Sequence, residues 1–121
     1  MTTAERSVPL VTACVLGRNE ERNLPRLFAS LEGLADEIVY LDTGSTDRSV
    51  EIARSSGAKI LESEWTADFA FHRNQSMDAA TGKWLLIIDS DEEVVQTDKA
   101  DFRRHLEEER HQVLTGTSAE L

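Results

Sequence analysis

The sequence is poor in cysteine and in basic residues, and it contains no long apolar run. Its single cysteine, Cys14, cannot form an internal disulfide, and its place in an apolar segment predicts a buried structural thiol. No run approaches the ~18 apolar residues that span a bilayer. The first seven residues lack the basic-then-apolar order of a secretory signal. These absences predict a cytoplasmic protein without a transmembrane segment.

Basic side chains are scarce relative to acidic ones. The chain has 121 residues, with 13 Lys and Arg against 23 Asp and Glu, for a net charge of −10. Such a surface repels nucleic-acid phosphates and anionic lipid headgroups, because no Lys/Arg cluster offsets it. We therefore expect no nucleic-acid partner. An anionic ligand would have to be met by a bound metal, an arginine or a helix N-terminus.

Two signatures of phosphate binding are also absent. The sequence contains no Gly-Lys-Ser/Thr and no Gly-x-Gly-x-x-Gly. These motifs supply the backbone cradles of P-loop and dinucleotide-binding sites. Their absence argues against both kinds of site.

What is present is a regular alternation of short apolar segments and helical patterns. The apolar segments recur about every 25 residues, at 10–16, 37–42, 59–62 and 84–89. Between them, apolar spacing and capping residues predict helices over 23–33, 46–56 and 68–80, the second of them capped by Ser45 or Thr46. This alternation is typical of an α/β fold, a Rossmann-like parallel sheet with helices on both faces. We expect one structural part over residues 1–95, followed at 96–121 by a charged helix over 97–112 and an unassigned tail.

Polar residues follow three of the predicted strands. An open parallel sheet binds ligands beyond the carboxyl ends of its strands, so these residues are the candidate site. Asp89 and Asp91 come directly after the most apolar strand, and paired carboxylates suit Mg²⁺ or Mn²⁺. An Asp-x-Asp triplet is weak evidence by itself, and its position after that strand is what strengthens it. Asp42 could accept hydrogen bonds from a nucleobase or ribose; the alternative is a solvated Asp in a capped turn.

The tryptophan and histidine side chains are better explained by packing or surface exposure than by ligand binding. Trp65 and Trp84 flank predicted strands, which favours core or edge packing over sugar stacking. His72, His105 and His111 show no metal-ligand spacing, so we expect surface histidines.

Four motifs together resemble a known family. In order and spacing they are similar to family 2 glycosyltransferases, above all the bacterial branch that includes lipopolysaccharide-core and peptide glycosyltransferases. The resemblance covers roughly residues 8–95. The motifs are residues 15–21, residues 42–47, Asp68-Phe69 with Arg73-Asn74, and residues 89–93.

The resemblance implies a GT-A fold that binds a nucleotide-diphosphate sugar, with a UDP-sugar favoured. It assigns Asp42 to contact with the base and Glu20 to the nucleoside pocket. Asp89 and Asp91 match the Asp-x-Asp that holds the ribose and, through Mg²⁺ or Mn²⁺, the diphosphate. Such a cation neutralises the leaving diphosphate. Arg73 could bind two phosphate oxygens with its guanidinium group. The alternative is an exposed arginine on a helix, without a ligand. Arg18 is a weaker candidate for the same work.

The resemblance leaves the catalytic residue unassigned. Only about 30 residues follow Asp91, and the sequence does not assign a general base among the candidates there, which are Asp98, Asp101 and Glu107 to Glu109. We expect a truncated, N-terminal donor-binding half of a glycosyltransferase. The alternative is a non-catalytic nucleotide-sugar-binding module that needs a second half or partner; an unrelated nucleotidyltransferase is a weaker reading. A half-domain would expose apolar surface, which predicts self-association or a partner chain.

Overall fold

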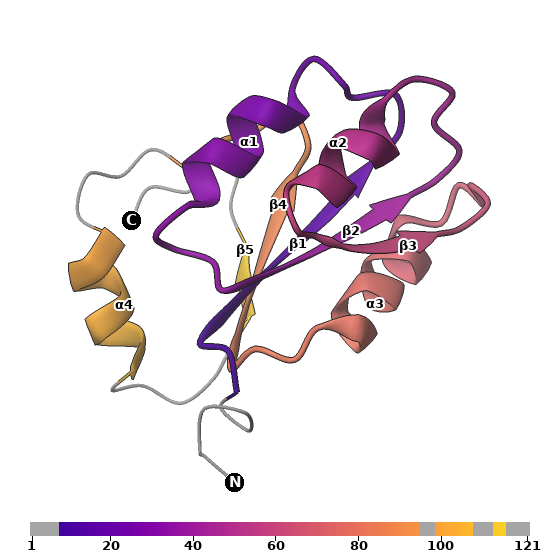
Figure 1. Ribbon diagram of the computed structural model, residues 1–121. Coiled ribbons are helices and arrows are strands. Elements are labelled where there is room, and N and C mark those ends of the chain that lie inside the picture. The colour runs from indigo at the N-terminus through magenta and orange to yellow at the C-terminus, as the bar shows by residue number, and fades with distance from the viewer. Residues whose placement is uncertain (1–7, 95–98, 108–112, 116–121) are drawn as a thin grey trace, which may run out of the picture.

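Five parallel strands form one sheet in the part of the chain that the computed structural model describes, residues 8–94, 99–107 and 113–115 (Figure 1). The strand order across the sheet is β3-β2-β1-β4-β5. The strands are β1 Val11–Gly17, β2 Glu37–Asp42, β3 Lys59–Glu62, β4 Trp84–Asp89 and β5 Val113–Thr115. The helices are α1 Leu24–Leu31, α2 Ser49–Ser55, α3 Phe69–Ala79 and α4 Lys99–Glu107. The predicted α/β architecture is confirmed.

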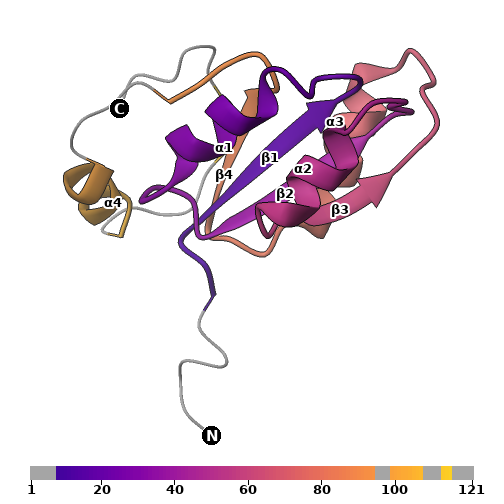
Figure 2. The same ribbon diagram turned by 45° about the horizontal axis from the view of Figure 1, so that its top comes forward.

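The strand order reverses direction at β1. The chain proceeds outward from β1 to β2 and β3, then returns across the sheet to β4 on the other side of β1. Helices α1 and α2 cover one face and α3 covers the other (Figure 2). The carboxyl ends of β1 and β4 therefore meet at a topological switch point, which is where open parallel sheets bind ligands.

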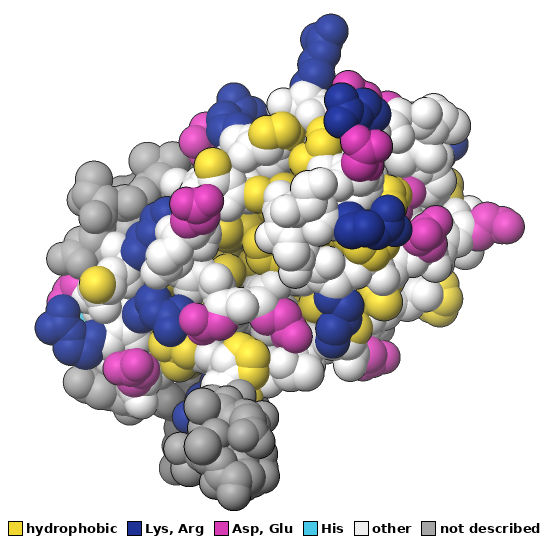
Figure 3. Space-filling view, in the orientation of Figure 1, with side chains coloured by type: hydrophobic (Ala, Val, Ile, Leu, Met, Phe, Trp, Pro, Cys, Tyr) yellow, Lys and Arg dark blue, Asp and Glu magenta, His cyan; other side chains and the backbone are white. Residues whose placement is uncertain are grey.

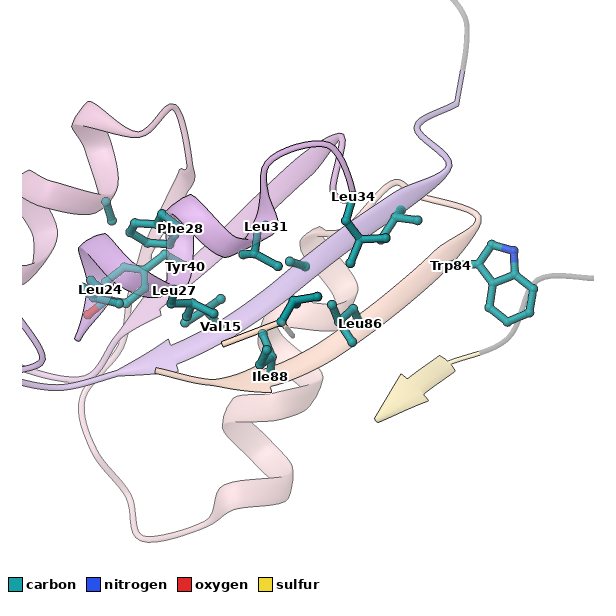
Figure 4. Packing of buried hydrophobic residues seen from close by; sticks show 14 of the residues in the cluster. Val15, Leu24, Leu27, Phe28, Leu31, Leu34, Tyr40, Trp84, Leu86 and Ile88 are labelled. Carbon is teal, nitrogen blue, oxygen red and sulfur yellow. The ribbon is translucent and has the colours of Figure 1, made fainter. Parts of the chain in front are cut away.

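The core lies between the sheet and α1 (Figure 4). In α1, apolar residues at i, i+3, i+4 and i+7 form one buried face: Leu24, Leu27, Phe28 and Leu31. Alternate residues of β1 and β4 face them, and the register pairs Val15 with Ile88. Each such side chain stabilises the fold by about 1.5–3 kcal/mol when fully buried. This packing fixes the edge of the sheet from which the site is built.

Helix α2 begins later than the sequence predicts. Capping by Ser45 or Thr46 is wrong, because the first helical residue is Ser49. The N-cap residue is Arg48, which makes no capping bond with its side chain. Asp47, just before it, accepts the Ser49 N–H at 2.9 Å and the Ser49 hydroxyl at 2.6 Å. Ser45 and Thr46 are engaged with Asn19 of the neighbouring loop. A contact between distant segments thus overrides a local capping preference.

The C-terminal region contains a strand that the sequence analysis left unassigned. Residues Val113–Thr115 pair with β4, Leu86 opposite Leu114. Three residues are too few to show a period, so only pairing with β4 identifies them. Helix α4 confirms the middle of the charged helix predicted over 97–112; positions 97–98 and 108–112 lie outside the described residues. The division at residue 95 stays a prediction.

Two further expectations concern single side chains and the membrane. Cys14 is buried, as predicted, and burial raises the pKa of its thiol to about 11. Trp84 is also buried, and its indole N–H donates to the Leu106 carbonyl at 3.0 Å. Among the helices within residues 8–94 and 99–107, none is long and apolar enough to cross a membrane.

Candidate functional site

A cleft of about 440 Å³ lies at the carboxyl edge of the sheet. The strand register creates it, because Leu16 pairs with Asp89 on one side of β1 and Gly17 pairs with Asp42 on the other. The loops that follow β1, β2, β3 and β4 all contribute to its walls. Its lining residues are Leu16, Gly17, Arg18, Glu20, Thr43, Trp65, Phe69, Asp89, Ser90 and Asp91.

The acidic wall contains three of the residues that the sequence assigns to binding. Glu20, Asp89 and Asp91 all line the cleft, and Asp89 and Asp91 are exposed to it. The turn that carries the two aspartates is held by Glu92, whose carboxylate accepts the Asp89 N–H at 2.8 Å. Ser90 between them also lines the cleft but is buried, so the exposed carboxylates of this turn are those of Asp89 and Asp91.

Asp42 reaches the same edge, but its carboxylate is buried. The residue is 3% exposed and does not line the cleft. Its oxygens accept the Tyr40 hydroxyl at 2.9 Å, the N–H groups of Gly44 and Ser45 at 3.1 and 2.8 Å, and the Ser45 hydroxyl at 2.5 Å. Burial, followed by this hydrogen bond to Asp42, holds the pKa of Tyr40 well above its usual range. Asp42 therefore organises the turn that presents Thr43, and its contact with a base stays a prediction.

Gly17 is required by the same cluster. A Cβ atom at this position would lie 2.7 Å from the Tyr40 hydroxyl oxygen and 2.8 Å from the ring atom Cε1. Both separations are shorter than real Cβ contacts. The absence of a side chain at Gly17 thus allows Tyr40 to reach Asp42.

The loops after β1 and β2 are joined by a set of hydrogen bonds. Asn19 adopts the left-handed conformation (φ 55°), which Asn tolerates better than most residues, and its amide oxygen accepts the Thr46 N–H at 2.7 Å. Further bonds run from Asn19 N–H to the Ser45 hydroxyl, Glu20 N–H to the Ser49 hydroxyl, Glu21 N–H to Asp47, and Arg48 N–H to Glu21. These bonds fix the two loops that carry Glu20 and Thr43, both of which line the cleft. The positioning role of Asn19 could not be found without the partner loop.

The cleft also has an aromatic part, and here the structure corrects one expectation and narrows another. Of the core or edge packing expected for Trp65, core packing is excluded, because the residue is 40% exposed and lines the cleft with Phe69, which is 57% exposed. His72 is not a surface histidine: it is fully buried and stacks on Trp65, with ring centroids 5.1 Å apart. His105 is exposed as expected, whereas His111 lies outside the described residues. The segment around Trp65 has neither strand nor helix periodicity. In the sequence, this lack of a period is the signal that the indole does not belong to a buried apolar face.

The structure reverses the order in which the sequence ranks the two candidate arginines as phosphate ligands. Arg18 lines the cleft itself. Arg73 is exposed on α3 and lines a small adjoining hollow of about 20 Å³, which it shares with Asp89 and Phe69. The structure thus gives Arg18 the better position for an anionic ligand, and a phosphate contact by Arg73 stays a prediction.

The acidic groups fit a divalent cation that is shared with a ligand. No group of three His, Cys, Asp or Glu is placed to hold a metal in residues 8–94, 99–107 and 113–115. Mg²⁺ commonly takes one or two carboxylates and completes its shell with phosphate oxygens and water. Asp89 and Asp91 supply such a pair at the open edge of the cleft.

A larger hollow, of about 1090 Å³, lies between α1 and α2 (Figure 3). It is bordered by Phe28 and Ile52 and by charged residues such as Arg48 and Glu51. It lies beside the amino ends of β2 and β3, at Glu37 and Lys59, rather than at their carboxyl ends. The smaller cleft is therefore the candidate site, since it alone of these two lies at the switch point.

Comparison with known proteins agrees with this geometry. Residues 12–120 match the family model described as Glycosyl transferase family 2. A TPR repeat-containing protein of Synechococcus elongatus is 43% identical over 98 residues, which are 81% of this chain and 24% of that protein. An uncharacterized glycosyltransferase of Rickettsia typhi is 30% identical over 86 residues, 71% of this chain and 29% of that protein.

The fold is shared with TarS of S. aureus. One TarS structure superposes with a TM-score of 0.68 at 24% identity, covering 82% of this chain and 20% of that one. A structure of TarS residues 1–349 in complex with UDP gives 0.63 at 23% identity, covering 82% and 32%. These likenesses show the GT-A fold. The chain spans between 20% and 32% of the length of the proteins to which it is compared.

Proposed function

The chain belongs to glycosyl transferase family 2, and we propose that its cleft binds a nucleotide-diphosphate sugar as the donor for glycosyl transfer. The observation that carries this proposal is the convergence of Glu20, Asp89 and Asp91 with Arg18 in one cleft at the switch point. The TarS complexes with UDP and with UDP-GlcNAc support a UDP-sugar as the donor. The motif order also supports the branch of lipopolysaccharide-core and peptide glycosyltransferases.

Each group at the cleft has a chemical role in this proposal. Asp89 and Asp91 hold the ribose and a Mg²⁺ or Mn²⁺ ion, and Arg18 meets the diphosphate. The ion would supply Lewis-acid neutralisation of the leaving diphosphate. Glu20 and Thr43 face the nucleoside. Contact of the base with Asp42 would require one of its four hydrogen bonds to be exchanged for the ligand.

A second candidate function is donor binding without catalysis. It is favoured by the small share of each relative that the chain covers, and by the absence of an assignable general base beyond Asp91 in its described part. The missing acceptor site and base would then come from another segment or a partner chain. Both functions predict nucleotide binding; only the first predicts transfer or hydrolysis of the donor by this chain.

The test is calorimetric titration with UDP-, GDP- and dTDP-sugars, in Mn²⁺ and in EDTA. We expect a UDP-sugar to bind in Mn²⁺ only. Asp91→Ala should abolish that metal-dependent binding and leave the circular dichroism spectrum unchanged, because Asp91 is exposed. Asp78→Ala, at an exposed position of α3 outside the cleft, is the matched control. Equal affinity with and without the ion, in wild type and Asp91→Ala alike, contradicts the proposal.

A further inference from the structure

The aromatic wall of the cleft has no role in the function proposed so far. We propose that Trp65, backed by His72 and flanked by Phe69, stacks on the nucleobase of the donor. This inference rests on the proposed function and adds a specific contact to it.

The exposure of the two rings is the first observation. Trp65 and Phe69 form an edge-to-face pair, with centroids 5.6 Å apart and planes at 83°. Both remain largely exposed although they line a concave surface. Exposed aromatic area in a cleft that also contains polar groups is typical of a ligand contact.

The support behind Trp65 is the second observation. His72 is fully buried, and its ring lies nearly parallel to the indole, at 15°. The Thr66 N–H can only donate, so Nε2 of His72, 3.2 Å away, must accept and carries no proton. Nδ1 is then protonated and donates to the Gln75 side-chain oxygen at 2.9 Å. An imidazole that is bonded at both nitrogens covers one face of Trp65, while 40% of the residue stays exposed at the cleft.

The position of Trp65 along the sheet edge selects the nucleobase. Strands lie about 4.8 Å apart, so the end of β3 is about 14 Å from the end of β4. Asp89 ends β4 and Asp91 lies two residues beyond it, whereas Trp65 follows β3. A nucleoside diphosphate held at these two carboxylates by its ribose and its ion-bound diphosphate would extend its base toward β2 and β3, with the transferred sugar beyond the phosphates. The base is therefore the ring within reach of Trp65.

Affinity for the base and selection of the base are therefore assigned to different residues of the cleft. Stacking tolerates any base, because every base has an aromatic face. Trp65 thus contributes affinity, and the identity of the base is left to the polar groups after β1 and β2. We expect Trp65→Ala to reduce the affinity for nucleotides with different bases by similar factors.

The experiment compares UDP, UDP-GlcNAc and inorganic pyrophosphate, each titrated with Mn²⁺ into wild type, Trp65→Ala, Trp65→Phe and Phe71→Ala. We expect Trp65→Ala to weaken UDP and UDP-GlcNAc equally, about 10-fold, and to leave pyrophosphate unchanged. Trp65→Phe should keep most of the affinity. Phe71→Ala is the matched control, because Phe71 touches His72, with ring centroids 5.2 Å apart, but lies outside the cleft.

His72 acts through Trp65, so its test is a double-mutant cycle. His72→Phe should weaken UDP in the wild-type background and have no further effect in Trp65→Ala. Additive losses would contradict the positioning role. A loss specific to UDP-GlcNAc would assign Trp65 to the sugar and overturn the inference, as would unchanged UDP affinity in Trp65→Ala or equal losses with pyrophosphate. If wild type binds no nucleotide at all, the proposed function fails as well; if binding depends on Asp91 but not on Trp65, only the inference fails.

Discussion

At the carboxyl edge of the sheet, burial decides what a carboxylate does. Asp42 and Asp91 are the same residue type, and both lie at the carboxyl end of a strand: Asp42 ends β2, and Asp91 comes two residues after the end of β4. Asp42 is enclosed by Tyr40 and its own turn, so its oxygens are occupied by hydrogen bonds within the chain. Asp91 is exposed at the cleft, so its oxygens face solvent and ligand. The carboxylate of Asp42 therefore stabilises the turn beside the cleft, whereas that of Asp91 is available to bind a ligand or an ion.

Gly17→Ala tests the cluster that holds Asp42. The new methyl group would force Tyr40 away from Gly17, and overpacking of this kind costs about 1–3 kcal/mol in the free energy of unfolding. The measurement is urea denaturation.

Tyr40→Leu gives the control for this prediction. This substitution removes the ring atoms that the methyl group would contact. It also leaves a cavity, because leucine is smaller than tyrosine, so it destabilises the fold by itself. The double variant should be clearly more stable than the sum of the two single losses predicts. Simple additivity would show that the clash with Tyr40 is not the cause.

At the scale of elements, one side chain ties the strands together at their amino ends. Glu37, the first residue of β2, accepts the hydroxyl of Thr12 in β1 at 2.7 Å. It also accepts the N–H of Thr81, just before β4, at 2.8 Å. The ammonium group of Lys59 in β3 lies 3.7 Å from its other oxygen. The order of the strands is thus reinforced at the edge opposite the cleft.

The acid stability of the fold depends on Glu37. Burial raises its pKa, but the hydrogen bonds from Thr81 and Thr12 and the charge of Lys59 outweigh this, and the net pKa is lowered. Because the folded pKa lies below the unfolded one, the stabilisation is present near neutral pH and is lost as the pH falls through the folded pKa. We expect Glu37→Gln to flatten the decline of the melting temperature between about pH 7 and pH 3.

Glu62→Gln, at an exposed position of β3, controls for the loss of one negative charge. If both variants change the acid profile equally, net charge rather than the hydrogen-bonded cluster is responsible.

For the whole molecule, the reversal of strand order at β1 is what creates the cleft. Loops from four strands meet there although their sequences are up to about 70 residues apart. Ligand binding at such a junction should stabilise the entire fold, because the site exists only when the strands are assembled. Self-association stays a prediction, as does the need for a partner.

Nucleotide binding is therefore expected to raise the melting temperature. With Mn²⁺ and UDP at 100 times the dissociation constant, stabilisation of about 2.7 kcal/mol corresponds to roughly 10 °C in a domain of this size. Differential scanning fluorimetry measures it. The rise should disappear in EDTA and in Asp91→Ala. A rise that persists in EDTA would contradict the assigned role of the ion.

The sequence by itself determined the features that depend on local pattern. The four principal strands, the apolar face of α1 and the acidic end of β4 all follow from residues close together in the chain, where period and composition are sufficient. The edge on which Glu20, Asp89 and Asp91 meet also followed, because parallel strands end on one side of a sheet.

Only the tertiary structure decided which of those polar and aromatic residues face the cleft. Tyr40 and Gly17 bury Asp42, Asn19 occupies the residues predicted to cap α2, and Thr66 and Gln75 hold His72 behind Trp65. Strand β5 exists through its pairing with β4. Each arrangement includes a partner from another strand or turn: Gly17 beside Tyr40 and Asp42, Asn19 for Thr46, Thr66 for His72, and β4 for β5. Burial and exposure are therefore settled by packing and cannot be read from a local period.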